Sequence, residues 1–502
     1  MIAKQVELAA LPCVTVALLA GASVAPRAAA QATPPPAGNP VAAADAVKPL
    51  FRLDLGDTTL LEVPGWEGAR FWIEGRWRSE YWAHFDTPAT DGRYDFSHFR
   101  FRQGMAQTVG PAEFGFEWQS TNVFGVDPDA PVGPGKAYLD ANGSRSPQNL
   151  TIRQLYAELD AGGTKLRGGR QLLEDGGAVK YDDGAFQWVR DRGNGRLIGN
   201  LEWPGGGRSY DGLSLRREEG GWIARAIAFE VNQGAFEVDD GGDSLENLHV
   251  GGIELINRRG GLLADAELRG FAYVFRDDRA VTRTKFGDDL FTTTAGGQFA
   301  ARRPVGGGVG DLFLWGAVQR GDAGTRAQRA GAWIAETGYR LEDVAWKPWL
   351  RLGHTRAQGD SEAADGEVND FFNGTPTNHP YYGFVDLFAL SNLRNTYVDL
   401  ILDPHPQLRF MASAHLLAGN HDDSRATFGS GAFTEKSFGY GTFATTSRNF
   451  GKELDLTLRA TTADKRHYLL LGWSWFRGGT AFERLFDDAN ATFGYLEAGF
   501  RF

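Results

Sequence analysis

Apolar and polar side chains alternate along many segments of about ten residues in this chain. In the first of them, 71–81, odd positions carry Phe71, Ile73, Trp77 and Tyr81, and the even positions from 74 onward are charged. The same alternation recurs at 98–105, 113–119, 395–402, 408–416 and 453–459. A period of two places successive side chains on opposite faces of a β-strand, so we expect strands with one apolar and one polar face.

The connections between these segments alternate between short and long. The short ones are turn sequences such as Gly110-Pro111, Glu219-Gly220-Gly221 and Thr462 to Asp464. The long polar ones cover 125–148, 174–207, 233–246, 277–288, 360–392, 420–449 and 478–490. A transmembrane β-barrel has this rhythm because its periplasmic turns are tight and its external loops are long. A soluble β-sandwich, the alternative, has no reason to sort its loops in this way.

The segments number about 18, which predicts an all-β fold: one transmembrane antiparallel β-barrel over residues 67–502, without a second domain. The barrel must close, because every backbone group of a sheet in lipid needs a partner within the protein. The last segment has apolar residues on its even positions and ends in Phe502, which resembles the signature read by the outer-membrane assembly machinery. In four segments, odd and even positions both carry charged or apolar groups, so the pattern does not decide which face of the strand points to lipid. These segments are 150–159, 164–172, 222–231 and 264–275.

The start of the chain predicts export from the cytoplasm. Residues 1–30 have the form of a secretory signal peptide, with Lys4, an apolar run from Leu8 to Val24 and small residues at Ala28 to Ala30. Residues 31–66, which include a run of three prolines, are expected to be a flexible leader. Beyond residue 30 there is no run of 18 apolar residues, which argues against a helical membrane protein. We therefore expect the outer membrane of a Gram-negative cell.

The composition agrees with a barrel and limits the chemistry and the partners to be expected. The 66 Gly suit turns, and the 14 Trp and 14 Tyr suit the two lipid–water interfaces of a barrel. The single cysteine, Cys13, lies within the expected signal peptide, so disulfides and thiol chemistry are not expected in the mature chain. The formal net charge of −11 argues against nucleic acid as a partner. It says little about the lumen, because the acids can lie in external loops.

Several strands place arginine on the polar face. An arginine at a lipid-facing midplane position would cost about 2–4 kcal/mol, so these side chains are assigned to the lumen. The inward set is Arg76, Arg78, Arg100, Arg102, Arg351, Arg409 and Arg459, with Arg153, Arg170 and Arg216 as additions. Glu74, Glu453 and Asp455 are expected among them as pore-lining acids.

Two interpretations of this arginine set stay open. The first is a network of salt bridges that fills the lumen and holds the shape of the barrel. The second is a series of guanidinium groups that conducts an anionic solute, because Arg remains charged and grips carboxylates through two hydrogen bonds. The loop 174–207 contains Trp188, Leu197, Ile198 and Trp203, too many apolar groups for a freely solvated loop, and is expected to fold partly into the lumen.

Catalytic and metal-binding patterns are weak. The nine His form no HExxH motif and no close metal-binding pair, and Ser413 and His415 share an inward face with no further sign of a hydrolase. Acidic turns at 239–243 and 487–488 are expected to be solvated, with Ca²⁺ binding as the alternative. We expect no catalytic residues, no metal site and no cofactor.

Four segments resemble a known family. The most specific is 371–388, where Thr377-Asn378-His379, Tyr381-Tyr382-Gly383 and Asp386 follow one another. This is similar to the Thr-Asn-His-x-Tyr-Tyr-Gly-x-x-Asp stretch of the alginate-export family of outer-membrane barrels. The others are Gly169-Arg170-Gln171, Glu202-Trp203 with Arg208 to Gly212, and Gly451 to Asp455.

The resemblance implies an 18-stranded channel that passes a uronic-acid polymer through an arginine-lined pore. Alternatively, the chain is an anion-selective porin for small organic or inorganic solutes. Expected partners are the anionic polysaccharide or small anion, outer-membrane lipid and the β-barrel assembly machinery, with a periplasmic helical-repeat protein as a further partner. The identity of the solute, the direction of transport and the oligomeric state do not follow from the residues.

Overall fold

The computed structural model describes residues 68–83, 85, 92–130, 132–279, 286, 288–362, 365–377, 379, 381–428 and 441–502, together with 52–53 and 61–62. The expected signal peptide, 1–30, lies outside the described residues. Of the expected leader, 31–66, only Arg52–Leu53 (β1) and Leu61–Glu62 (β2) are described, and they pair as a short antiparallel ladder.

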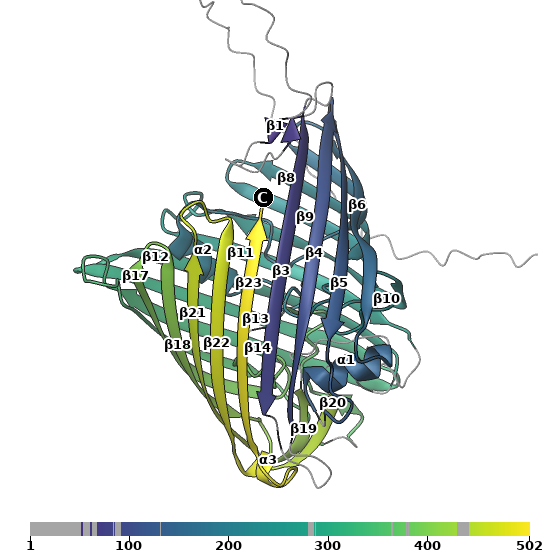
Figure 1. Cartoon of the computed structure of the whole chain (residues 1–502), viewed down its shortest axis with the longest axis vertical. Helices are drawn as coiled ribbons and strands as arrows, with labels where there is room; N and C mark the ends of the chain where they lie inside the picture. Colours follow the sequence, from purple (N-terminus) through teal and green to yellow (C-terminus); the bar gives the residue numbers. More distant parts are fainter. Residues whose placement is uncertain are drawn as a thin grey trace, which may run out of the picture. The chain divides into compact units, whose positions relative to one another are not determined.

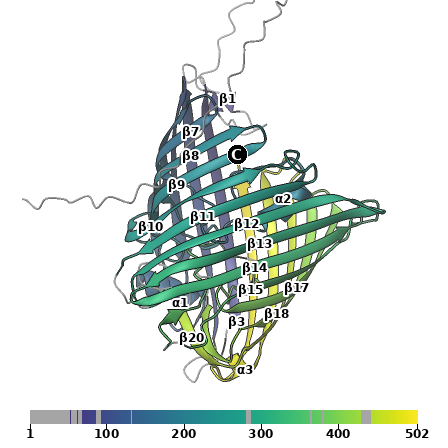
Figure 2. The same ribbon diagram turned by 180° about the vertical axis from the view of Figure 1, so that it is seen from behind.

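Eighteen long strands form one closed antiparallel barrel, which confirms the predicted fold class and strand number (Figures 1 and 2). In chain order they are β3 (Ala69–Ala83), β4 (Arg93–Val109), β5 (Ala112–Phe124), β6 (Gln148–Asp160), β7 (Thr164–Gln171), β8 (Tyr210–Glu219), β9 (Trp222–Asn232), β10 (Ser244–Asn257), β11 (Ala266–Asp277), β12 (Leu290–Val305), β13 (Gly308–Ala323), β14 (Arg326–Arg340), β15 (Trp349–Ala357), β17 (Leu393–His405), β18 (Leu408–Ala418), β21 (Asn449–Thr461), β22 (His467–Gly478) and β23 (Asn490–Arg501). Each pairs with its neighbours along the chain.

Shorter elements accompany this ring. The two-residue β16 (Glu367–Val368) lies beside β14, and β19 (Asp423–Phe428) and β20 (Gly441–Thr446) form a separate hairpin. The helices are α1 (Pro134–Asn142), α2 (Gly184–Asp191) and α3 (Thr480–Glu483). None of the helices in the described part of the chain is long and apolar enough to cross a membrane.

The last strand closes the barrel against the first. β23 pairs with β3 in antiparallel register, from Thr492 opposite Ala83 to Arg501 opposite Glu74. The ladder continues to the C-terminal residue, where Phe502 N–H donates to the Ile73 carbonyl at 2.9 Å and the Phe502 oxygen accepts from Ile73 N–H at 3.0 Å. The wall therefore has no free edge, as a sheet in lipid requires.

Short and long connections are sorted to the two ends of the barrel, as the sequence predicts. α1, α3 and the β19–β20 hairpin belong to long connections at one end, whereas the C-terminus lies at the other (Figure 1). One connection at the long-loop end is short: Gly324-Thr325 joins β13 to β14 directly, with Gly324 at φ +61°. The positive φ explains glycine at this turn.

Side-chain burial follows the predicted parity. On β3, Arg76 and Arg78 keep 6% and 1% of their surface exposed, whereas Trp77 and Tyr81 between and beyond them keep 43% and 42%. Apolar groups thus face outward to lipid and charged groups face inward, the reverse of a soluble protein.

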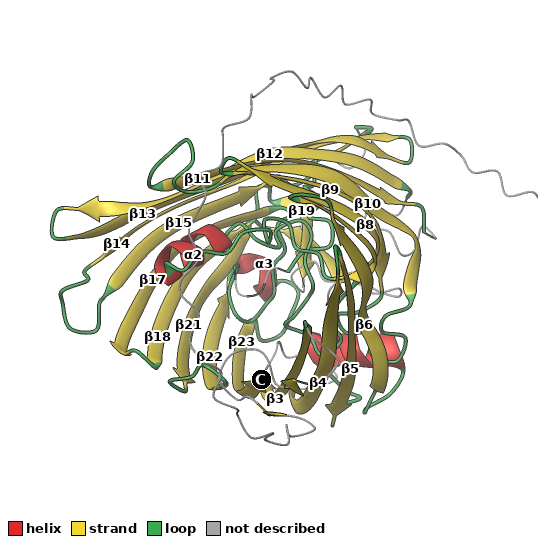
Figure 3. Ribbon diagram, turned by 90° about the horizontal axis from the view of Figure 1, so that it is seen from above, coloured by secondary structure: helices red, strands yellow, loops and turns green. Residues whose placement is uncertain are grey.

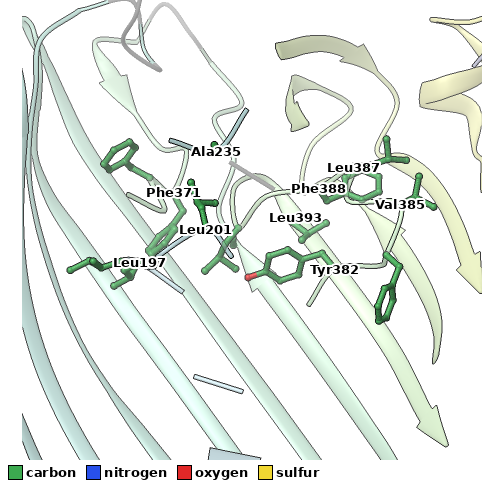
Figure 4. Packing of buried hydrophobic residues seen from close by; sticks show 14 of the residues in the cluster. Leu197, Leu201, Ala235, Phe371, Tyr382, Val385, Leu387, Phe388 and Leu393 are labelled. Carbon is green, nitrogen blue, oxygen red and sulfur yellow. The ribbon is translucent and has the colours of Figure 1, made fainter. Parts of the chain in front are cut away.

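The interior of the barrel is not an open tube. Seen along its axis, the ring of strands encloses α2, α3 and long loops (Figure 3). Side chains from these loops form an apolar cluster against the inner wall, which includes Leu197, Leu201, Phe371, Tyr382 and Phe388 (Figure 4). The two main contributors are the connection 172–209, called here loop A, and the connection 358–392, called loop B.

The assignment of the apolar face to lipid can be tested by placing a charge on it. Leu314, near the middle of β13, is 41% exposed to the outside. We expect Leu314→Arg to lower the free energy of unfolding by about 2–4 kcal/mol, because the charge would sit at the lipid midplane. Urea titration in lipid vesicles, followed by tryptophan fluorescence, measures this. The matched control is Leu150→Arg near the external end of β6, where a cost of about 0–1 kcal/mol is expected; equal costs would contradict the assigned depth.

Candidate functional site

Three inward arginines meet one carboxylate, that of Glu202 in loop A. Arg100 and Arg102, alternate residues of β4, place Nη2 atoms at 3.0 and 2.9 Å from Glu202 Oε2, and Arg153 of β6 contacts Oε1. The arginines are buried, but the glutamate side chain keeps 41% of its surface exposed. Despite this exposure, desolvation by the surrounding protein opposes the ionisation of Glu202. The guanidinium groups of Arg102, Arg153 and Arg100 outweigh it and hold the pKa of Glu202 well below its usual range.

Two further arginines grip the backbone of the same loop segment. Arg76 donates to the Glu202 carbonyl at 2.6 Å, and Arg78 donates to the Trp203 carbonyl at 2.6 Å. The Arg78 guanidinium also lies 3.5 Å from the centre of the Trp203 ring, a cation–π contact. We call Arg76, Arg78, Arg100, Arg102 and Arg153 the arginine cluster; Glu74, which contacts Arg100 at 3.3 Å and Arg102 at 3.2 Å, lies at its edge.

Loop A is held against the inner wall by further ion pairs. Asp175 contacts Arg269 of β11 at 3.1 Å, and Arg192 contacts Glu336 of β14 at 2.9 Å. Between them lies α2, whose N-cap residue Asp183 accepts hydrogen bonds through its side chain from the backbone N–H groups of residues 185 and 186. The prediction that this loop folds into the lumen is confirmed, because Leu197 and Ile198 are fully buried.

Loop B lies alongside loop A and is joined to it by backbone hydrogen bonds. Gly199 N–H donates to the Thr375 carbonyl at 2.8 Å, and Thr377 N–H donates to the Gly195 carbonyl at 2.7 Å. Farther along, the His379 ring stacks on Trp203 with centroids 3.5 Å apart. The two loops therefore form one structure across the lumen.

Loop B is also tied to the wall at the segment 451–455 of β21, one of the four segments that resemble the family. Val385 N–H donates to Glu453 Oε1 at 2.8 Å, and Phe384 N–H approaches Asp455 Oδ1 at 3.4 Å. Glu453 and Asp455, expected as pore-lining acids, are thus buried, and both accept hydrogen bonds from the backbone of loop B. His379 Nδ1 contacts Asp386 at 3.0 Å within loop B.

The other expected arginines lie apart from the arginine cluster. Arg351 is buried between Asp311 and Glu336 at 2.8 and 2.7 Å, and Arg170 makes two hydrogen bonds to Asp211 at 2.8 and 2.7 Å. The remaining three have contacts nearer the short-turn end: Arg216 with Glu218, Arg409 with Asp403 at 2.7 Å, and Arg459 with the Tyr468 ring at 4.6 Å. The structure thus brings five of the ten arginines together.

Several partners of these arginines escaped the sequence analysis. Glu202 and Trp203 carry the resemblance as a pair and lie in the loop expected to enter the lumen, but nothing in the local pattern indicates that they contact these arginines. Arg269, buried between Asp175 and Glu254, lies in one of the four segments with ambiguous parity. Among the described residues, no three potential metal ligands converge.

A closed barrel with a lipid-facing wall and a charged interior defines an outer-membrane channel, located in the outer membrane of Gram-negative cells. The chain belongs to the alginate export family, whose model matches residues 132–494. The family and fold are those of transport channels rather than enzymes. A search of curated proteins finds no significant match to the sequence.

Solved structures of outer-membrane proteins share the fold. Pseudomonas aeruginosa OpdK, solved with vanillate, aligns with TM-score 0.52 and 13% identity over 86% of this chain and 98% of its own. OccAB1 of Acinetobacter baumannii aligns with TM-score 0.57 and 10% identity over 87% of this chain and 97% of its own. OccK2 (OpdF) of P. aeruginosa aligns with TM-score 0.55 and 13% identity over 87% of this chain and 98% of its own. At these identities the likeness shows the fold alone.

The carboxylate of Glu202 is open to test. In Glu202→Gln, the arginine cluster would lose its bound anion and regain net positive charge. We expect a rise in anion over cation preference, measured as the reversal potential across a planar bilayer in a salt gradient. Asp140→Asn on α1, an exposed acid in the same external half, is the control and should leave the potential unchanged. An unchanged potential in Glu202→Gln would show that the ions do not pass the cluster.

Proposed function

We propose that this channel passes an anionic polysaccharide, an alginate-like uronate polymer, and that the carboxylates of the polymer move from one inward arginine to the next. The observation that carries the proposal is the contact of Glu202 with three arginines, because it shows a carboxylate held by the cluster. A uronate has the same functional group on every sugar. Glu202 would then stand where a sugar carboxylate binds during passage.

Glu202 of loop A partly neutralises the arginine cluster, which suits a channel that conducts the polymer better than a site that binds it tightly. Conduction requires several weak sites, because one strong site would trap the polymer. A substrate carboxylate must compete with Glu202 for the same guanidinium groups, which lowers its net affinity. Arg170, Arg216, Arg409 and Arg459 would supply further contacts on either side; a neighbouring acid partly neutralises the first three, and Arg459 lies over the Tyr468 ring. Arg351 is buried between two carboxylates and would act only by holding the wall in place.

An anion-selective porin for small solutes is the second candidate. Loops A and B interlock across the lumen, which suits a narrow passage better than a polymer path. One of the similar structures, OpdK, was solved with vanillate, a small aromatic carboxylate. The β-barrel assembly machinery is a proposed partner in both cases, and a periplasmic helical-repeat protein is proposed only for the exporter.

Blocking experiments separate the two functions. We expect oligouronates added from the periplasmic side to block anion current, and neutral oligosaccharides of equal length to have no effect. Because each hydrogen bond to a charged group contributes about 1.5–3 kcal/mol, Arg100→Gln with Arg102→Gln should weaken the block at least about tenfold. Arg217→Gln, an exposed arginine on the outer wall, is the control.

The opposite results are equally informative. Equal block by charged and neutral sugars would exclude carboxylate recognition. Block by monomeric carboxylates as strong as block by oligouronates would favour the small-solute porin. High salt should weaken the block by oligouronates, since it screens those contacts that remain in water.

A further inference from the structure

The outer wall carries an unusual arrangement of cations at its external end. Three pairs of basic residues lie directly opposite each other on neighbouring strands, and every pair has the outward parity. They are Arg320 with Arg329, Arg356 with Arg394, and Lys452 with Arg477. Like charges directly opposite in a sheet are destabilising, so these pairs need an anion to offset them.

The pair Lys452 and Arg477 has no such anion within the described protein. Both side chains are exposed; Lys452 lies on β21, and Arg477 lies at the end of β22 that precedes α3. No carboxylate of a described side chain forms an ion pair with either residue, although Asp487 and Asp488 lie in the connection that follows β22. By contrast, Arg217 at the periplasmic end of the outer wall is paired with Glu219 at 2.6 Å.

An apolar groove runs from this pair toward the centre of the membrane. Its volume is about 720 Å³, and Lys452 and Arg477 stand at its external end. The outward side chains that line it are 42–63% exposed: Val398, Leu416, Leu454 and Trp475. Asn490 and Thr492 add polar groups on the β23 side. Cations at the interface above an apolar groove match a lipid with an anionic head group.

We propose that Lys452 and Arg477 bind a phosphate of a phosphorylated glycolipid of the outer leaflet, of the lipid A class, whose acyl chains lie in the groove. The external end of an outer-membrane barrel meets that leaflet, and its lipids carry phosphates on a sugar head group. Arg394 and Arg356, the next like-charged pair along the wall, would contact the rest of the head group. The proposal concerns the outer wall and does not depend on what the lumen conducts.

Native mass spectrometry of the purified full-length protein in detergent tests this proposal. We expect bis-phosphorylated lipid A to bind at least about tenfold more weakly to Lys452→Gln with Arg477→Gln than to the wild type. Arg303→Gln, which removes an exposed outward cation at the periplasmic end of β12, is the matched control and should not change binding. Lys452→Arg should retain it, because the charge is kept.

Three lipid probes decide the outcome. Dephosphorylated lipid A keeps the acyl chains and should bind as weakly to the wild type as intact lipid A binds to the double variant. Phosphatidylglycerol that binds as tightly as lipid A would overturn the proposal in favour of a general anionic-lipid surface. Equal binding of intact lipid A to the wild type and the double variant would also overturn it. If the double variant fails to fold, Lys452→Gln and Arg477→Gln are measured singly, with heat-modifiable gel mobility as the test of folding.

Discussion

The structure depends on one requirement, that every backbone hydrogen bond of a sheet in lipid be made within the protein. The ladder between β3 and β23 meets it by joining the two ends of the sheet, down to the bonds between Ile73 and Phe502. Once the sheet is closed, the parity of each residue decides whether it faces lipid or the lumen. The inward position of the arginines is therefore a consequence of closure and register, since a shift by one residue would turn them toward lipid.

The sequence predicted the strands well where the two faces differ in polarity, as at 71–81 and 453–459. It failed to assign the faces of 222–231 and 264–275 because the lumen there is not aqueous. Ile223 packs in a small apolar cluster with Val179 of loop A, and Phe271 and Phe275 belong to the large one. Inward positions are then apolar too, and the alternation disappears from the sequence.

The arginine cluster could be predicted only in part, for a similar reason. Parity assigned Arg76, Arg78, Arg100 and Arg102 to the interior, but their partners, Glu202 and Trp203, belong to a loop far away in the sequence. Nothing local to Glu202 indicates that its carboxylate meets β4. The same holds for Arg351, which shares the buried Glu336 with Arg192 of loop A. Because removing one member of a buried ion pair costs about 3–5 kcal/mol, such networks also fix the position of the loop.

The hydrogen bonds between loops A and B have a mechanical consequence. Gly199 is bonded to Thr375 and Thr377 to Gly195, so neither loop can leave the lumen alone without breaking bonds to the other. Their apolar side chains also share one cluster, which would be exposed to water if the loops separated. Movement of either loop alone would therefore cost more free energy than movement of the two together, so the pair behaves as one mechanical unit.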